Sequence, residues 1–551
     1  MRGLPSPLRS AVAGAGYVAV LALGTRPPAA YAQAAPRDED ARVPGHGIVW
    51  LEVVPSFAHW NEQFTEDGSG PDGGSSEPLF SDFDGPLAGR LFPGLDPLLA
   101  DVNRDAAALG YDSVTAADLA LGSLEFGTID KEVRSVAFAL SVGLFGRLSL
   151  DAALPLVQGR VKTDFRFDGS TARFVPAAVA LPNPDGLFGP AAAARSDLEA
   201  LVAGGGLDPA QEAFATELLD RSGAFTTALQ DRVDAGTLLP TAPSPAGAGM
   251  AATWGELAAG FESFGLALPE LPLPDSAGPN GLSALLAAPP IQGDPLGDVD
   301  RGWSTGDVEI GLRLKLLDTF GSVPRPAEGP YRRTREPDLR GSGLRLRTTV
   351  GARVRLPTAS ADADPNLVPT TFLQLPVSDG QTDVEVAVWQ DVQVGSLLWL
   401  VAAVRRTWQL EDDLEVRIAP AGRPFAFAGQ QRVVSRDLGD RFAVRVSPRL
   451  RLDETVGLGL EYLWESKDED TFTAQGAPDP SPLSVRTEEE RHRLGIGVYY
   501  RTSPRRAAGL ARLPIEAAFI WQTSIAGDGG LTPDSDVFSL SFRVPIGVLG
   551  S

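Results

Sequence analysis

A strict alternation of polar and apolar residues constrains the fold of this chain more than any other feature. Residues 307–315 read Asp-Val-Glu-Ile-Gly-Leu-Arg-Leu-Lys. A period of two is that of a β-strand, so the aliphatic side chains of this segment share one face and most of the charged side chains share the other. The pattern recurs in segments of about the length that a strand needs to cross a bilayer, roughly 9–11 residues. We therefore expect a transmembrane β-barrel rather than a soluble sandwich.

The number of these segments predicts the size of the barrel. The expected fold class is all-β, a closed antiparallel transmembrane β-barrel of about 12 strands with helical loop inserts. Closure is expected because an open strand edge in lipid would leave backbone groups unpaired. Long and short connections largely alternate, as extracellular loops and periplasmic turns do. The predicted strands lie near residues 47–60, 135–144, 148–167, 307–316, 344–356, 382–394, 397–408, 441–452, 456–465, 492–500, 514–523 and 537–548.

The N-terminus carries the pattern of an export signal. Arg2 and Arg9 are basic, residues 11–24 are apolar, and Ala30-Tyr31-Ala32 is a small-x-small cleavage site. The apolar stretch is too short to cross a membrane as a helix. The predicted organisation is a signal peptide cleaved after Ala32 (1–32), an N-terminal linker (33–46) and the barrel (47–551), with helix-containing extracellular loop inserts at 61–131 and 170–302.

Helices are predicted inside both inserts. Asp96-Pro97 and Asp208-Pro209 each place an aspartate at the N-cap and a proline in the first helical turn. Gln211 completes a capping-box pattern with Asp208. We expect the larger insert to form a cap over or inside the barrel mouth, and a separate soluble domain is the alternative.

Charge and cysteine content exclude two classes of protein. The 551-residue chain has a formal net charge of −23, and loss of residues 1–32, which hold three arginines and no acid, would take it to −26. Nucleic-acid binding needs clustered positive charge, so no nucleic-acid partner is expected. The chain has no cysteine and is therefore not a lipoprotein.

The polar faces of the predicted strands define a candidate lumen. Opposite charges fall on neighbouring strands, so two interpretations stay open: a lining that attracts and orients a solute, or interlocking ion pairs that hold a narrow barrel rigid. We favour ion pairs for most of these residues, whereas Trp389 could stack on an apolar solute. The predicted lumen lining is Glu309, Arg313, Arg345, Arg347, Arg353, Arg355, Glu385, Trp389, Asp391, Arg445, Arg449, Glu461 and Arg493.

Two further features of the strands carry expectations. After Gln158-Gly159 the apolar residues move from even to odd positions, which predicts a β-bulge at or beyond the membrane edge. Aromatic residues near strand ends are interpreted as girdles at the membrane interfaces. They are Trp50, Trp60, Trp399, Trp408, Trp464, Tyr500 and Trp521.

No pattern in the chain predicts catalysis, a cofactor or a metal. Residues 302–306 match G-x-S-x-G, but that motif needs a strand-to-helix elbow and a strand follows here. His46, His59 and His492 have no metal-ligand spacing. The acidic pairs at 82/84 and 362/364 fall on predicted loops and are interpreted as solvated. We therefore expect a protein that is not an enzyme.

Three segments resemble one family of outer-membrane proteins. The hairpin at residues 135–156, the segment at 306–312 and Arg355-Leu356-Pro357-Thr358 are similar to the family associated with the meta-pathway of phenol degradation. The resemblance implies an outer-membrane channel or transporter for small hydrophobic or aromatic solutes, related to the long-chain fatty-acid transporter. Its partners would be outer-membrane lipid, the barrel-assembly machinery and a small-molecule solute.

Two other functional classes stay open. One is a non-transporting structural or surface-interaction barrel of the outer membrane, whose long loops contact other cells, phage or matrix. The other is a soluble exported β-protein. Conductance in a planar bilayer separates the first from a channel, and solubility without detergent identifies the second.

Overall fold

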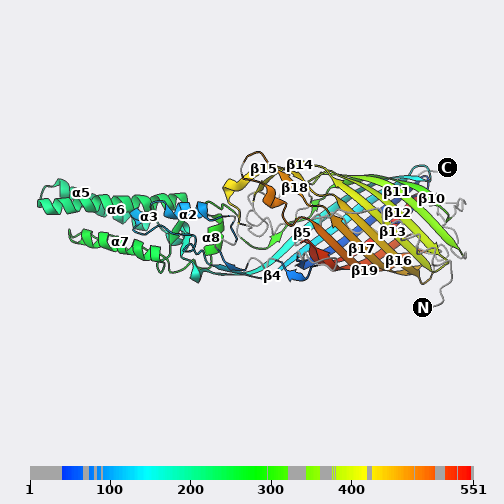
Figure 1. Ribbon diagram of the computed structural model, residues 1–551, viewed down its shortest axis with the longest axis horizontal. Coiled ribbons are helices and arrows are strands. Elements are labelled where there is room, and N and C mark those ends of the chain that lie inside the picture. Colours follow the sequence, from blue (N-terminus) through cyan, green and yellow to red (C-terminus); the bar gives the residue numbers. More distant parts are fainter. Residues whose placement is uncertain are drawn as a thin grey trace.

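The computed structural model describes residues 40–65, 74–79, 84–87, 91–92, 94–293, 296–320, 343–359, 375, 378, 380–418, 425–453, 455–476, 478–502, 515–529 and 532–547. The predicted signal peptide and its cleavage site lie outside these residues, as do the acidic positions 82, 362 and 364. The described chain forms a barrel with a long helical projection at one end (Figure 1).

Twelve long antiparallel strands form the barrel, which confirms the predicted fold class. Each strand pairs with its neighbour in the order β1-β21-β20-β19-β17-β16-β13-β12-β11-β10-β5-β4, and pairing of β4 with β1 closes the cylinder. The strands are β1 (Ile48–Phe64), β4 (Ser123–Gly143), β5 (Leu148–Asp168), β10 (Val308–Asp318), β11 (Leu344–Leu356), β12 (Asp383–Val394), β13 (Leu398–Gln409), β16 (Arg441–Arg451), β17 (Val456–Lys467), β19 (Glu489–Arg501), β20 (Glu516–Asp528) and β21 (Pro533–Gly547).

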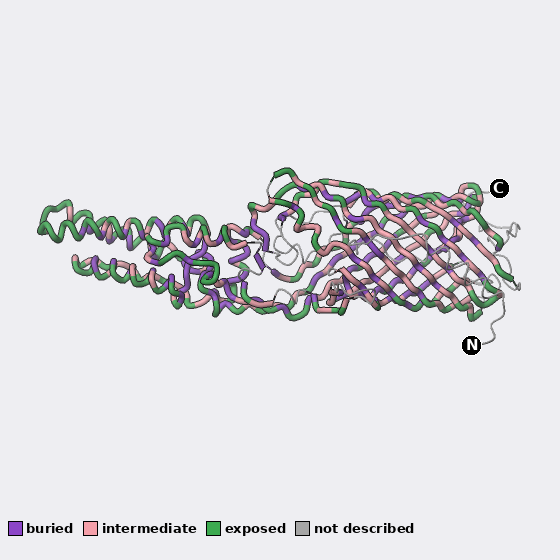
Figure 2. The backbone as a smooth tube through the Cα atoms, viewed as in Figure 1, coloured by how far each residue is buried: buried purple, intermediate pink, exposed green. Residues whose placement is uncertain are grey.

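The barrel wall is apolar outside and polar inside. On β10, Leu312 is 50% exposed whereas Glu309 is 4% exposed, as expected when successive side chains point to opposite faces. The same alternation of exposed and buried positions runs around the wall (Figure 2). An exposed aliphatic surface over a whole barrel would be costly in water, and it is the surface that a bilayer accommodates.

Helices and short strands lie at the barrel end opposite to the first residue of β1 and the last residue of β21, which pair with each other. The helices are α2 (Asp96–Asn103), α3 (Ala106–Leu109), α4 (Ala177–Ala180), α5 (Asp185–Ala203), α6 (Pro209–Ala235), α7 (Pro245–Glu262) and α8 (Gly281–Ala287). The short strands are β2 (Ser76–Pro78), β3 (Gly85–Pro86), β6 (Phe174–Pro176), β7 (Leu238–Pro240), β8 (Val299–Asp300), β9 (Ser304–Thr305), β14 (Asp412–Arg417), β15 (Gln431–Asp437) and β18 (Thr471–Thr473).

The helix starts agree with the sequence patterns in one case and differ in the other. At α6 the side chain of Asp208 accepts from the backbone N–H groups of Ala210 and Gln211, and the Gln211 side chain accepts from the N–H of Asp208, which is the predicted capping box. At α2, Leu95 is the N-cap and Asp96 lies in the first turn, where its negative charge still faces the positive end of the helix dipole.

The larger insert was expected as a cap over or inside the barrel mouth, and its three long helices lie outside the barrel. Helices α5, α6 and α7 extend away from the barrel along the long axis of the molecule (Figure 1). A hydrophobic core runs along this projection and includes Phe92, Leu98, Phe225 and Phe261, each at most 1% exposed. Among the described residues, no helix is both long enough and apolar enough to cross a membrane.

The predicted bulge after Gly159 was also wrong. Strand β5 runs unbroken from Leu148 to Asp168, and its register shift with β4 lies elsewhere, between Phe126 and Ile129. The apolar positions change parity because β5 leaves the barrel there, and its inward side packs against the core of the projection. Val157 and Val161 are at most 1% exposed in that core.

Candidate functional site in the barrel lumen

Charged side chains of β10, β11 and β12 form a connected network on the inner wall. Arg353 lies between Glu309 (Nη1 to Oε2, 3.4 Å) and Glu385 (Nη1 to Oε1, 3.6 Å). Arg355 extends the network, with its Nε 3.8 Å from Glu309 Oε1 and its guanidinium paired with Asp383. These groups face one another because the strand registers place Glu309, Arg355 and Asp383 in one row across the wall. Each charge is therefore neutralised inside the barrel.

A second network lies on β16, β17 and β19. Glu461, which is 1% exposed, accepts from Arg445 Nε at 2.6 Å and from the Ser447 hydroxyl at 3.0 Å. Glu465 lies four residues further along β17 on the same face and pairs with Arg491 at 2.5 Å and with Arg493 at 4.0 Å. Two glutamates on one strand are thus held between arginines of both neighbouring strands.

Each network contains an aromatic ring that lies flat over glycine and under an arginine. A Cβ at Gly351 would lie 2.8 Å from the ring of Trp389, and the Arg313 guanidinium lies 4.5 Å from the ring centroid. The ring needs the space that glycine leaves, and the arginine covers its other face in a cation–π contact. Trp389 is 2% exposed and is a packed part of the wall.

Tyr499 has the same arrangement in the second network. A Cβ at Gly459 would lie 2.8 Å from its ring, one at Gly497 would lie 2.7 Å from its hydroxyl, and Arg449 lies 4.0 Å over its centroid. The Tyr499 hydroxyl donates to Glu461. The inward glycines of β17 and β19 therefore make room for a ring against the wall.

A segment before the first strand crosses this lumen. Residues 40–43 belong to the predicted linker, and here they lie inside the barrel: Asp40 is 3% exposed and Ala41 is 0% exposed. The Ala41 N–H donates to Asp391 Oδ1 at 3.1 Å, and the Thr349 hydroxyl donates to the Ala41 carbonyl at 2.6 Å. We call residues 40–43 the lumen segment.

Arginines anchor the lumen segment on the opposite wall. Arg42 donates to both carboxylate oxygens of Glu516, at 2.8 and 2.9 Å, and also to Asp40. The carboxylate of Asp40 lies 3.8 Å from Arg543 Nη1. Burial raises the pKa of Asp40, but the charges of Arg42 and Arg543 outweigh it and hold that pKa well below its usual range. The segment is therefore joined to β11, β12, β20 and β21 by polar contacts.

The structure places the sequence-predicted lumen residues on buried or half-buried positions that alternate with outward aliphatic ones. It brings most of them into the two networks or against the lumen segment: Arg347 lies 3.4 Å from Asp391, and Arg313 lies 3.4 Å from Asp151. Arg345 is set apart, with no ion pair among the described residues. The inward residues not predicted as lining include Asp40, Arg42, Glu52, Asp151, Glu516 and Arg543.

The aromatic girdle prediction was wrong at three positions. Trp50 lies inside, with Arg543 5.0 Å from its ring centroid. Trp60 is 4% exposed in the core of the projection, and Trp399 packs against Phe320 with centroids 5.7 Å apart. The other four aromatic residues point outward, each on the same face of its strand as the exposed aliphatic residues. They are Trp408, Trp464, Tyr500 and Trp521.

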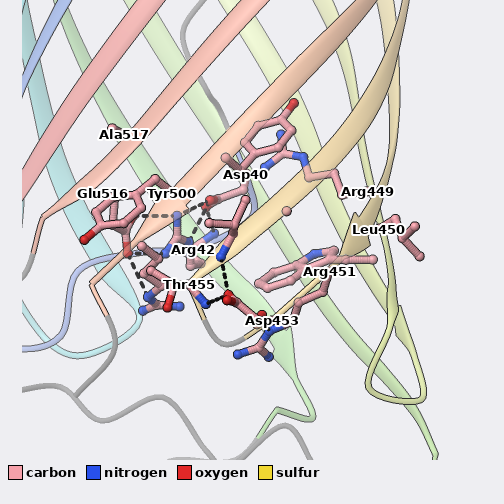
Figure 3. Close-up of a pocket in the computed structure, with 15 residues that line it drawn as sticks. Asp40, Arg42, Arg449, Leu450, Arg451, Asp453, Thr455, Tyr500, Glu516 and Ala517 are labelled. Atoms are coloured by element: carbon pink, nitrogen blue, oxygen red, sulfur yellow. Dashed lines mark hydrogen bonds and ion pairs between the residues drawn. The ribbon is translucent and has the colours of Figure 1, made fainter. Parts of the chain in front are cut away.

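One cavity of about 130 Å³ lies at the barrel end where β13, β17 and β20 begin (Figure 3). The lumen segment contributes Asp40 and Arg42 to its lining, and the wall contributes Trp399, Arg451 and Tyr499. It is therefore bounded by both the fixed wall and the segment that crosses the lumen.

Metal and catalytic groupings are not found in the described part of the chain. No group of three His, Asp or Glu side chains there could hold a metal ion. Ser304 of the G-x-S-x-G pattern lies in β9, next to β5, and its hydroxyl lies 3.3 Å from the carbonyl of Val157. His492 lies 2.8 Å from the Tyr462 hydroxyl, on the outward face.

Comparisons with known proteins return structural likeness only. No protein-family model and no curated protein matches the sequence. The COG4313 outer membrane channel from Pseudomonas putida F1 is similar over 93% of this chain and 100% of that chain, with 9% identity and a TM-score of 0.39. A Pseudomonas aeruginosa FadL homologue is similar over 96% of this chain and 100% of that chain, with 9% identity and a TM-score of 0.28. The CymD monoaromatic hydrocarbon channel is similar over 91% of this chain and 89% of that chain, with 8% identity and a TM-score of 0.24. Identities and TM-scores this low carry no argument about function.

Proposed function

We propose that this chain is an outer-membrane channel for small hydrophobic or aromatic solutes, and that the lumen segment closes it in the state described. The outer-membrane location rests on the closed barrel, its exposed aliphatic outer surface and the export signal expected at residues 1–32. Insertion would then depend on outer-membrane lipid and on the barrel-assembly machinery. The helical projection would lie outside the cell and the termini in the periplasm.

The observation that carries this proposal is the lumen segment itself. It occupies the interior through a few hydrogen bonds and ion pairs, with Ala41 and Val43 as its buried apolar side chains. It contributes no strand to the wall, so its departure would break no ladder hydrogen bond of the barrel. A removable segment across a closed barrel is a means of opening a path without unfolding the wall.

The solute class rests on the resemblance to the phenol-degradation family and on the lumen. Its charged groups are largely paired with one another, and aromatic rings lie among them. A wall whose charges are neutralised internally exerts little field on a passing ion. It therefore suits a small uncharged or singly charged solute better than a strongly charged one.

Conductance in a planar bilayer tests the proposal. We expect the mature chain to conduct weakly, and the double variant Asp40→Asn/Arg42→Gln to conduct several times more, because it removes the ion pairs to Glu516 and Arg543. The matched control is Glu132→Gln/Arg134→Gln, which breaks an exposed ion pair of 3.1 Å outside the lumen. Deletion of residues 40–43 should give the highest conductance. Equal conductance in all four proteins would refute the channel.

One observation favours the alternative, a surface-interaction barrel. Helices α5 to α7 extend far from the wall and carry exposed side chains over much of their length (Figure 2). If every variant is correctly folded and none conducts, the ion-pair networks of the lumen serve only to hold the barrel rigid. The helical projection would then be the part of the molecule that binds a partner.

A further inference from the structure

We propose that the cavity at the end of the lumen is a binding site for a small aromatic carboxylate. This inference deepens the proposed function, since it names the solute class that the channel would select. It rests on two properties of the cavity: its size and aromatic walls, and a guanidinium without a carboxylate partner among the described residues.

The size and the walls fit one aromatic ring. The cavity measures about 130 Å³, and protein cavities of about 150 Å³ are known to hold benzene. Trp399 lines it from β13 and Tyr499 lines it from β19, and Leu450, Val456 and Ala517 add aliphatic surface. Aromatic side chains favour stacked or edge-on contacts with another ring. Tyr499, whose faces are covered by glycine and by Arg449, offers its edge, and these walls therefore select a flat apolar body.

Among the arginines that line the cavity, Arg451 differs from the others because it has no carboxylate partner among the described residues. Arg42 and Arg501 both pair with Glu516, and Arg449 lies 4.0 Å from Glu461. Arg451 has no ion pair among the described residues, and its Nε donates to the backbone carbonyl of Asp453 at 2.9 Å.

The nearby carboxylate of Asp453 forms no ion pair with Arg451. Its Oδ1 accepts from the backbone N–H groups of Thr455 and Val456, at 2.5 and 2.7 Å, and so caps the turn between β16 and β17 (Figure 3). The remaining N–H groups of Arg451 match a carboxylate, which a guanidinium binds through two parallel hydrogen bonds.

These two properties together select the ligand. A hydrocarbon would leave Arg451 without an anionic partner, and a small anion without a ring would leave the aromatic walls uncovered. A ring that carries one carboxylate fits both.

The site also adjoins the lumen segment. Asp40 and Arg42 form part of the lining, so a bound carboxylate would lie close to the ion pairs that hold the segment in place. A ligand that binds more tightly to one position of the segment shifts the balance between positions. A bound carboxylate would therefore contact the segment that we propose closes the barrel.

Equilibrium dialysis of the full mature chain in detergent, with labelled benzoate as the probe, tests the site. We expect saturable binding at neutral pH. Arg451→Gln should weaken it at least about tenfold, because it removes a charge-assisted bidentate contact, and Trp399→Phe should weaken it less, because it keeps an aromatic wall. Benzyl alcohol and acetate should bind far more weakly than benzoate.

Two matched variants control for general damage. Arg147→Gln changes an exposed arginine in the turn between β4 and β5, at the same end of the barrel. Trp408→Phe changes the outward tryptophan at the other end of β13. Both should bind benzoate as the parent does, and strand content by circular dichroism should be equal in all variants.

The outcomes separate this inference from the channel itself. Absence of saturable benzoate binding, or equal loss in Arg451→Gln and Arg147→Gln, overturns the site even if the lumen-segment variants conduct. Benzoate binding that depends on Arg451, in a protein that never conducts, supports the site and removes the channel.

Discussion

The two ends of strand β5 have opposite polarity on an unbroken backbone. Within the barrel its outward residues are aliphatic, with Leu150 42% and Leu154 39% exposed. Beyond the barrel its inward residues are aliphatic, with Val157 1% and Val161 0% exposed. The apolar face follows the apolar medium, which is lipid on the outside of the wall and the packed core on the inside of the projection. A change of hydrophobic parity can therefore mark the end of a membrane span without any change of register.

The largest effect should come from a charge in the core of the projection. Val161→Asp places a carboxylate among side chains that offer no partner, and we expect a loss of about 3–5 kcal/mol in the stability of the projection. Limited proteolysis of the helices and hydrogen exchange would measure it. The barrel strands should keep their exchange protection, and loss of protection in both parts together would contradict the separation of the two regions.

The second effect concerns the lipid face of the wall. Leu312→Arg or Val444→Arg puts a charge on the outward side near mid-strand and should cost about 2–4 kcal/mol in a bilayer. Ser141→Arg, on the inward phase of β4, should cost less. Urea titration of the barrel in lipid vesicles compares the three variants. Similar midpoints for all of them would mean that the faces are misassigned.

A buried arginine joins the two inserts at the base of the projection. Arg232 of α6 is 2% exposed and donates to the carbonyls of Val102 at 2.7 Å and Leu238 at 3.1 Å, as well as to that of Arg104. Burial lowers the pKa of its guanidinium, which nonetheless stays charged at neutral pH. Arg232→Met keeps the aliphatic stem and removes the hydrogen bonds of the guanidinium to these carbonyls, although the carbonyl of Val102 keeps the Tyr111 hydroxyl as a donor. We expect a loss of about 1–3 kcal/mol. Thermal unfolding of the helices, compared with Arg221→Met on the exposed side of α6, would detect it.

An exposed aromatic residue of the projection should matter least for stability. Phe214 on α6 is 43% exposed and contacts Phe264 with ring centroids 6.1 Å apart. Phe214→Ala should change stability by about 0.5 kcal/mol or less, in contrast to the fully buried Phe225 on the same helix, where removal of the ring should cost about 3–5 kcal/mol. Equal losses at the two positions would show that the tip of the projection is covered by a partner.

Acidification should leave the ion pairs of Asp40 in place over the usual range. The pKa of Asp40 is lowered in the folded protein, so its contribution is fully present above the unfolded value near 3.8 and is lost only as pH falls through the lower, folded value. Any rise in the conductance of the parent between about pH 7 and pH 5 should therefore come from another group that holds the segment, such as Asp391, which accepts from the Ala41 N–H. The same rise in Asp391→Asn would contradict this.

The wall was predictable because it depends on local pattern, and the lumen segment was not. A strand with one lipid face and one polar face shows its period in any ten residues, so the strand series and the charged phase of β10 to β12 follow from the sequence. The segment around Ala41 shows no alternation of polar and apolar residues. Its position depends on partners that are hundreds of residues away in the sequence, such as Asp391 and Glu516. The short pattern Asp40-x-Arg42 gives no local reason for burial.

The aromatic residues show a second limit of prediction from the sequence. Trp399 and Trp408 lie on one strand at an odd spacing, so the period of two places them on opposite faces, and only the outward one can belong to a girdle. Counting phase from the exposed Leu398 would have assigned Trp399 to the interior. Trp60 was misread for another reason: β1 continues beyond the wall, where the inward side is a protein core.

The seam of the barrel sets the order in which the chain can assemble. Strand β1 pairs on one side with β4 and on the other with β21, so that Val53 lies opposite both Phe138 and Phe542. The first contact can form early in synthesis and export, whereas the second joins residues almost at the two ends of the chain. Until the last strand arrives, β1 and β20 both present open edges, which are surfaces for mispairing and aggregation. A chain that ends before β21 should therefore be lost as an aggregate or to proteases, even though eleven strands and the whole projection have already been made.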